Sequence, residues 1–138
     1  MEKTVKKVKT LGKLKKDVWT PFSLYIRTRD CLRTTGCKSW GLCITCGKRY
    51  HIKLLQAGHY IPGRYSANLF METGVHAQCY NCNINLKGNT HVYAKKLIEL
   101  YGEGHPEFLH LNNQVDKKFT RQELEELKAF YEAKIKEL

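Results

Sequence analysis

The stretch "LCITCGKRYHIKLLQAGHYI", residues 42–61, joins a pair of cysteines to a strand-like segment that ends near a histidine. Cys43 and Cys46 have the CxxC spacing of a zinc knuckle, in which two thiolates of one turn face the same metal ion. The apolar segment that follows ends at His59, just before a proline turn. The stretch therefore predicts a metal-binding turn that leads into a strand with a histidine at its end.

A second pair of cysteines stands in "VHAQCYNCN", where Cys79 and Cys82 repeat the CxxC spacing. Two such pairs supply the four thiolates of a closed, structural zinc site. Paired cysteines in a chain without a secretory signal favour a metal over disulfides. We expect the zinc to tie the start of a hairpin to the start of a helix, and to supply much of the folding energy. Cys31 and Cys37 lie outside this pattern and could join a second site, form a disulfide or stay free, which we favour.

Segments on either side of the cysteines have helical signals. We expect a first helix over residues 19–30, with Thr20 as the N-cap and Pro21 in the first turn, followed by a loop over 31–41. The basic segment before this helix, residues 1–17, is predicted to be a solvated arm.

A turn or loop over residues 62–69 leads to a second strand-like segment, "LFMETGVHAQC", and helices follow it. A helix is predicted from about Asn83, and another in "THVYAKKLIELYG", which should end at Gly102. The next segment looks irregular. Thr120 and Glu123 then predict a capping box at the start of a final amphipathic helix, whose apolar stripe is either core packing or a dimer seam.

The charge of the chain points to a polyanionic partner. The 138 residues include 24 basic and 13 acidic side chains, a net charge of +11, and the first sixteen residues are rich in lysine. Nucleic-acid phosphate is the commonest partner for such a domain, and an anionic membrane is the weaker alternative. Without a long apolar run or the apolar core of a secretory signal, we expect a soluble, cytoplasmic protein.

Six motifs together resemble the phage lambda NinG/Rap recombination family across roughly residues 17–102. They are "DVWTPFSLYIRTRD", "CITCG", "LQAGHY", "VHAQCYNCN", "GN" and "YAKKLIELYG". The zinc-clamped frame also resembles the ββα-metal, or HNH, nucleases. The resemblance implies an α+β fold, a small zinc-stabilised ββα-metal core with flanking α-helices. It divides the chain into a basic arm (1–17), an HNH-like nuclease domain (18–102), and a linker with an amphipathic helix (103–138).

The same resemblance implies a structure-specific endonuclease that cuts Holliday junctions and D-loops. His59 corresponds to the general base of the family. Asn83 matches an asparagine of endonuclease VII-type resolvases that binds Mg²⁺ or Mn²⁺, which suits an amide oxygen. Gly58 stands where these families often have an acidic metal ligand, and Gly74 stands where HNH enzymes have an asparagine. The second ligand is therefore open: His76 is the first candidate, with Gln56, Glu72, Asn85 and Asn89 as alternatives.

Several basic residues could bind DNA phosphates beside the break. Branched DNA is the expected partner, and two symmetric cuts in a junction favour a homodimer. Two alternatives remain: a noncatalytic zinc-ribbon DNA-binding protein, and an HNH nickase or homing-type nuclease that reads duplex sequence. A zinc-organised protein-interaction module explains the positive charge less well. The expected phosphate contacts are Lys48, Arg49, Lys53, Arg64 and Lys87 around the motif, and Arg27 and Arg29 on the first helix.

Overall fold

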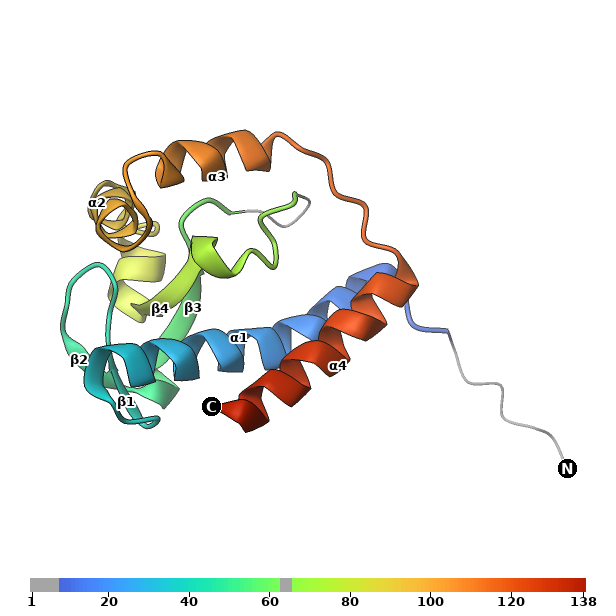
Figure 1. Cartoon of the computed structure of the whole chain (residues 1–138), viewed down its shortest axis with the longest axis horizontal. Helices are drawn as coiled ribbons and strands as arrows, with labels where there is room; N and C mark the ends of the chain where they lie inside the picture. Colours follow the sequence, from blue (N-terminus) through green and yellow to red (C-terminus); the bar gives the residue numbers. More distant parts are fainter. Residues whose placement is uncertain (1–7, 63–65) are drawn as a thin grey trace, which may run out of the picture.

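A computed structural model of the chain describes residues 8–62 and 66–138. It has a mixed fold in which helices surround two small antiparallel sheets, which confirms the predicted α+β class (Figure 1). The elements in chain order are α1 (Leu11–Thr35), β1 (Trp40–Leu42), β2 (Arg49–His51), η1 (Ile52–Leu54), β3 (Leu55–His59), η2 (Glu72–Gly74), β4 (Val75–Cys79), η3 (Asn81–Asn85), α2 (Thr90–Tyr101), α3 (His105–Asn113) and α4 (Arg121–Glu137).

The first helix starts earlier and ends later than predicted. Thr10 is its N-cap and Gly36, with a φ of 75°, ends it, while Pro21 lies inside the helix. Leu14 and Val18 are buried against the start of α4, and this packing keeps the preceding turns helical despite the proline. The placement of residues 11–17 in an arm was therefore wrong, and residues 1–7 lie outside the described part of the chain.

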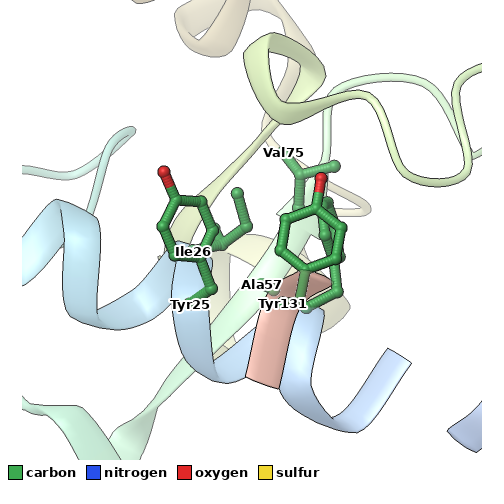
Figure 2. Packing of buried hydrophobic residues seen from close by; sticks show 6 residues of the cluster. Tyr25, Ile26, Ala57, Val75 and Tyr131 are labelled. Atoms are coloured by element: carbon green, nitrogen blue, oxygen red, sulfur yellow. The ribbon is translucent and has the colours of Figure 1, made fainter. Parts of the chain in front are cut away.

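β3 and β4 form the hairpin at the centre of the molecule. Their register pairs Ala57 with Ala77 and His59 with Val75. Because successive side chains of a strand point to opposite faces, these four residues share one face of the hairpin. α1 and α4 cover that face, where Ala57 and Val75 pack with Tyr25, Ile26 and Tyr131 (Figure 2).

The opposite face of the hairpin is covered by α2 and α3. Tyr93 and Leu97 of α2 and Leu109 of α3 are buried together with Ile44 and Tyr60. α3 occupies the segment that the sequence suggested to be irregular, and this prediction was wrong. The helix forms because its proline stands in the first turn and because Leu109 is buried in the core.

The remaining helical predictions are confirmed in part. α2 ends at Gly102 as expected, but the turns after the second cysteine pair form a short π-helix, η3, and α2 starts only at Thr90. The capping box of Thr120 and Glu123 is present at the start of α4. The stripe of α4 packs against α1 through residues such as Tyr131, so it belongs to the core of this chain.

Candidate metal centre and histidine site

The structure brings the four cysteines of the two CxxC pairs together at one end of the hairpin. All four sulfur atoms lie within 4.8 Å of one another, and the Sγ atoms of Cys46 and Cys79 are 3.8 Å apart. Thiolates about 2.3 Å from a tetrahedral zinc ion would be about 3.8 Å from each other. Backbone amides also point at the sulfurs: Cys79 donates to Cys43 Sγ, and Cys82 donates to Cys79 Sγ. The cluster can therefore hold a structural zinc ion.

The electrostatics of the cluster also suit a cation. Burial raises the pKa of Cys43, but hydrogen bonds from backbone amides and from the Thr45 hydroxyl outweigh it and lower the pKa to about 6. Burial, together with the neighbouring sulfurs of Cys43 and Cys79, raises the pKa of Cys46 to about 12. A divalent cation would offset the repulsion between four thiolates. Cys31 and Cys37 are free thiols outside the cluster.

His59 stands at the end of β3 with its ring held from two sides. Its Nε2 lies 3.0 Å from the carbonyl oxygen of Leu69, and its ring stacks on Trp19 of α1 with the centroids 5.2 Å apart. Because a carbonyl only accepts, Nε2 carries the hydrogen and Nδ1 keeps its lone pair. Burial lowers the pKa of His59, although the bond to Leu69 opposes this shift. The ring is therefore neutral at neutral pH, and Nδ1 can accept a proton.

A hollow of about 940 Å³ opens beside His59. The first two turns of α1 form one of its walls and contribute Lys13, Lys15 and Lys16. No carboxylate is present among the described residues that line it. A neutral histidine in a hollow that lysines also line provides a proton acceptor in a site that attracts anions. The sequence analysis missed these lysines as site residues because it placed them in an arm.

Asn83 lies in η3, on the other side of the hairpin from His59. Its Nδ2 donates to Gln56 Oε1 over 2.7 Å, so its own Oδ1, the atom that hard cations prefer, is not used in this bond. Gln56 and His59 point to opposite faces of β3 because they are three residues apart. The structure therefore brings Asn83 next to Gln56 and does not bring it next to His59.

Gly58 leaves no room for the acidic side chain that the resemblance to HNH nucleases would place at this position. A Cβ atom there would lie 2.1 Å from Gln78 Oε1. Two bonds from Nε2 fix the Gln78 amide, one to Thr45 Oγ1 over 3.2 Å and one to the Gly88 carbonyl over 2.8 Å. Within the described residues, Gln78 Oε1 is a buried side-chain oxygen without a hydrogen-bond partner. Gly74 is also confined, since its Cβ would lie 3.0 Å from a methyl carbon of Leu109.

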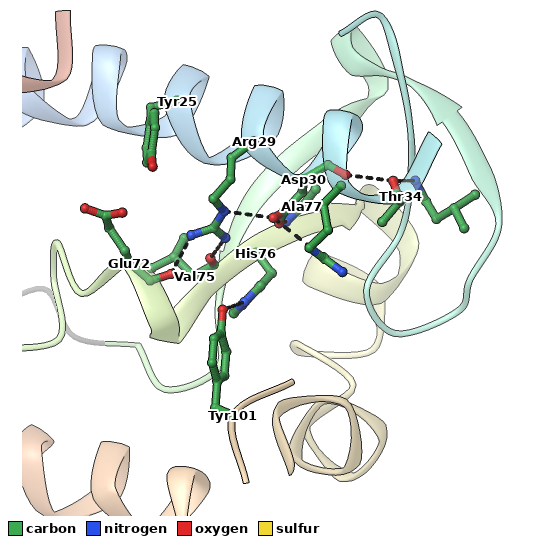
Figure 3. A network of polar contacts seen from close by, with 12 residues as sticks. Tyr25, Arg29, Asp30, Thr34, Glu72, Val75, His76, Ala77 and Tyr101 are labelled. Atoms are coloured by element: carbon green, nitrogen blue, oxygen red, sulfur yellow. Dashed lines mark hydrogen bonds and ion pairs between the residues drawn. The ribbon is translucent and has the colours of Figure 1, made fainter. Parts of the chain in front are cut away.

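His76 is fully buried and both of its ring nitrogens are engaged. Nδ1 lies 3.1 Å from the Tyr93 hydroxyl, and this hydroxyl donates its hydrogen to the Gly58 carbonyl. Nε2 lies 2.8 Å from the Tyr101 hydroxyl (Figure 3). The Tyr93 proton is used on the carbonyl, so His76 donates through Nδ1 and accepts from Tyr101. His76 is therefore a hydrogen-bonding residue of the core, and neither nitrogen can bind a cation without losing one of these bonds.

Three of the other candidates for a second cation ligand form side-chain hydrogen bonds with residues other than Asn83. Glu72 accepts a hydrogen bond from Tyr131, Asn85 donates to Asn81, and Asn89 points at Cys82 Sγ. Gln56 is the candidate whose side chain contacts Asn83.

The expectation that Arg27 and Arg29 extend a DNA-binding surface is not supported. The guanidinium of Arg29 binds the Asp30 carboxylate and the carbonyls of Glu72 and Val75 at 2.8–2.9 Å (Figure 3). Arg27 is half-buried and donates to Ser23 and to the Ile52 carbonyl. Both side chains stabilise the packing of α1 against the rest of the fold.

The remaining expected phosphate contacts lie on the surface of the half that carries the four-cysteine cluster. Lys48, Lys53 and Lys87 are exposed, and the guanidinium of Arg49 lies 4.7 Å from the centre of the Trp40 ring. Arg64 falls outside the described residues. Among the described residues, no helix is long and apolar enough to cross a bilayer.

Comparison with known proteins gives one match. The model of the NinG family, described as bacteriophage lambda NinG protein, matches residues 1–138. No curated protein and no solved structure matches the chain.

Proposed function

The chain belongs to the bacteriophage lambda NinG family of phage recombination proteins, and we propose that it is a structure-specific DNA endonuclease. Its proposed substrates are branched recombination intermediates such as Holliday junctions and D-loops. The observation that carries the proposal is His59, a neutral histidine with a fixed tautomer at the edge of a hollow lined by lysines. This is the environment that a general base needs for hydrolysis of a phosphodiester.

In the proposed reaction, Nδ1 of His59 takes a proton from a water molecule while the water oxygen attacks the phosphorus. The new P–O bond forms as the bond to the 3′-oxygen breaks, and the 3′-oxygen takes up a proton from solvent water, which leaves a 5′-phosphate and a 3′-hydroxyl. The lysines of the hollow stabilise the negative charge that builds up on the phosphate oxygens. The Leu69 carbonyl holds the neutral ring in the required tautomer before the transfer and continues to accept the Nε2 hydrogen afterwards.

We propose Mg²⁺ or Mn²⁺ as the catalytic cofactor and zinc as the structural one. The chemistry of the amide oxygens of Asn83 and Gln56 fits a hard cation, and substrate phosphates would supply the anionic ligands that these two side chains lack. A cation bound there would stabilise negative charge on a phosphate at that face of the hairpin. A second copy of the chain is proposed for the paired cuts that resolve a junction.

A noncatalytic zinc-ribbon DNA-binding protein is the second candidate. The close contact between Gly58 and Gln78 favours it, because this contact excludes an acidic cation ligand at position 58. The separation of Asn83 from His59 by the hairpin favours it as well.

The deciding experiment compares cleavage by the parent protein, His59→Ala and His91→Ala. Each is incubated with a labelled four-way junction, a D-loop and a linear duplex of the same sequence, with Mg²⁺, Mn²⁺ or chelator. We expect the parent to cut branched DNA preferentially and His59→Ala to lose about 10²–10⁴-fold in rate, with zinc content and junction affinity retained. His91 is an exposed residue of α2 and serves as the matched control, which should cut like the parent.

The other outcomes separate the alternatives. Asn83→Ala should also lose activity, and excess Mn²⁺ should partly restore it but should not restore His59→Ala. Equal cutting of linear and branched DNA would favour the homing-type nuclease. A parent protein that binds junctions but cuts nothing with any divalent cation would establish the zinc-ribbon binder instead.

A further inference from the structure

The lysines that line the hollow belong to helix α1, where a solvated basic arm was predicted. α1 starts at Leu11, and the side chain of Thr10 caps it by accepting a hydrogen bond from the Lys13 amide. Lys13, Lys16 and Thr20 are three and four residues apart, so they share one face of this helix. This face of α1 lines the hollow, and His59, at the end of β3, lines the same hollow.

The balance of charge on this face favours an anion. Asp17 is the nearest carboxylate in sequence, and it pairs with both Lys9 and Lys13 at 3.0 and 3.1 Å. The hydrogen bonds from these two lysines lower the pKa of Asp17, which keeps it ionised. Lys16 is exposed and forms no salt bridge within the described residues. Two lysines therefore share one carboxylate, and Lys16 adds a positive charge that Asp17 does not offset.

The size and position of the hollow fit a segment of one nucleic-acid strand. Its volume of about 940 Å³ is at the upper end of the roughly 300–1,000 Å³ typical of ligand sites. Lysine binds phosphate as a point charge, without a demand for one geometry. A phosphate held by Lys16 at this wall would lie in the same hollow as the ring of His59.

We propose that the first two turns of α1 form the phosphate-binding wall of the active site, with Lys16 and Lys13 binding the backbone of the strand to be cut. The inference rests on the proposed endonuclease function and deepens it. The basic N-terminal region then has two parts. The part in α1, from Leu11, positions the substrate at His59. The residues before the helix contribute only nonspecific electrostatic attraction to DNA. Lys16 is a substrate-binding residue, and its contact with phosphate sets the distance from the scissile bond to the base.

Tryptophan fluorescence tests the proposal without any need for cleavage. The chain has two tryptophans, so Trp40→Phe leaves Trp19, which lines the hollow and stacks on His59, as the single reporter. An unlabelled four-way junction is titrated into this protein without added Mg²⁺ or Mn²⁺, which prevents metal-dependent cutting and leaves the structural zinc in place. We expect the Trp19 emission to change on binding.

Lys16→Gln and a matched control are then compared in the Trp40→Phe background. Lys16→Gln should weaken junction binding several-fold and make the slope of log affinity against log salt shallower by about 1. Lys136→Gln removes an exposed lysine from the end of α4 and should change neither. With Mg²⁺ or Mn²⁺, Lys16→Gln should also cut more slowly, while its zinc content stays that of the parent.

The outcomes distinguish this inference from the proposed function. If the parent cuts junctions but Lys16→Gln binds and cuts like Lys136→Gln, the inference is wrong and the endonuclease stands. If the parent cuts nothing but Trp19 and Lys16→Gln respond as expected, the hollow binds nucleic-acid phosphate and the endonuclease is wrong. An equal Trp19 response to anionic lipid vesicles would assign the hollow to a membrane surface and overturn the inference.

Discussion

At the scale of single residues, Gly58 and Gln78 depend on each other. Gly58 is the one residue type that leaves space for the Gln78 amide, and Thr45 and Gly88 hold that amide in place. A side chain at position 58 would therefore occupy the space that Gln78 of the opposite strand fills. Comparison with a family motif identifies Gly58 as a departure from the motif. It does not reveal that the Gln78 side chain fills the space beside Gly58.

Gly58→Ala should destabilise the protein by about 1–3 kcal/mol, the usual cost of overpacking a buried site. The added Cβ would force the Gln78 oxygen away and strain both of its amide hydrogen bonds. Urea unfolding followed by circular dichroism measures the change. Gly104→Ala is the control, because nothing lies within 4 Å of a Cβ at that position. Equal stability of the two variants would show that the Gln78 side chain moves aside freely.

His76 should make stability depend on pH. Burial lowers its pKa to about 3, against an ordinary value of 6.5. Between these values the unfolded chain binds a proton that the folded protein excludes, so stability is complete above pH 6.5 and falls as the pH drops toward 3. The difference in unfolding free energy between the parent and His76→Phe should therefore shrink on acidification, by about 1.4 kcal/mol per pH unit.

Chemical denaturation of both proteins at several pH values between 4 and 8, as approximate limits for a titrating histidine, measures this difference. Protonation of the zinc cysteines affects both proteins alike and cancels in the comparison. A difference that stays constant across the range would mean that His76 takes up a proton as readily in the folded as in the unfolded state.

Residue roles could be predicted from the sequence where a spacing carries the chemistry. The four cysteines cluster as expected because two CxxC turns can meet at one metal. The partner of His59 could not be predicted, because a backbone carbonyl such as that of Leu69 has no signature in the side-chain pattern. Arg29 looked exposed because its partner carbonyls, among them that of Val75, come from distant parts of the chain.

At the scale of elements, α1 shows how a local signal can be overruled. Thr20 and Pro21 form a plausible helix start, but Leu14 and Val18 bury enough apolar surface to keep the preceding turns helical. The capping box of α4 was predictable because it is a purely local arrangement. α3 was not, since its folding depends on the burial of Leu109 against α2.

The zinc knuckles are the element whose loss should matter most. Cys79→Ser removes a buried sulfur that both accepts the Cys82 amide and lies 3.8 Å from Cys46. We expect bound zinc to fall from about one ion per chain to almost none, and the hairpin to lose its cooperative unfolding transition. Elemental analysis and thermal melts measure the two effects. Cys37→Ser, at an exposed thiol outside the cluster, should keep both zinc and stability.

At the scale of the whole molecule, the hairpin lies between two helical layers with different roles. α1 and α4 cover the face that carries His59, and α2 and α3 cover the face with His76 (Figure 1). The α+β class and the hairpin beside a zinc knuckle could be predicted from the sequence. The side of the hairpin on which each site residue falls could not, because it depends on strand register and on which helix packs where.

The packing of α4 on α1 also has a consequence during protein synthesis. Tyr131 closes the apolar cluster around Phe22, yet α4 is translated after every other described element. While the chain grows on the ribosome, the apolar side of α1 has no cover from its eventual neighbour, and closing so long a loop is slow. Nascent chains therefore expose the apolar face of α1 until α4 has been translated. Such an exposed apolar face is a site to which chaperones can bind. Trp19, which packs against the same cluster and stacks on His59, acquires its final surroundings only when that last helix has docked.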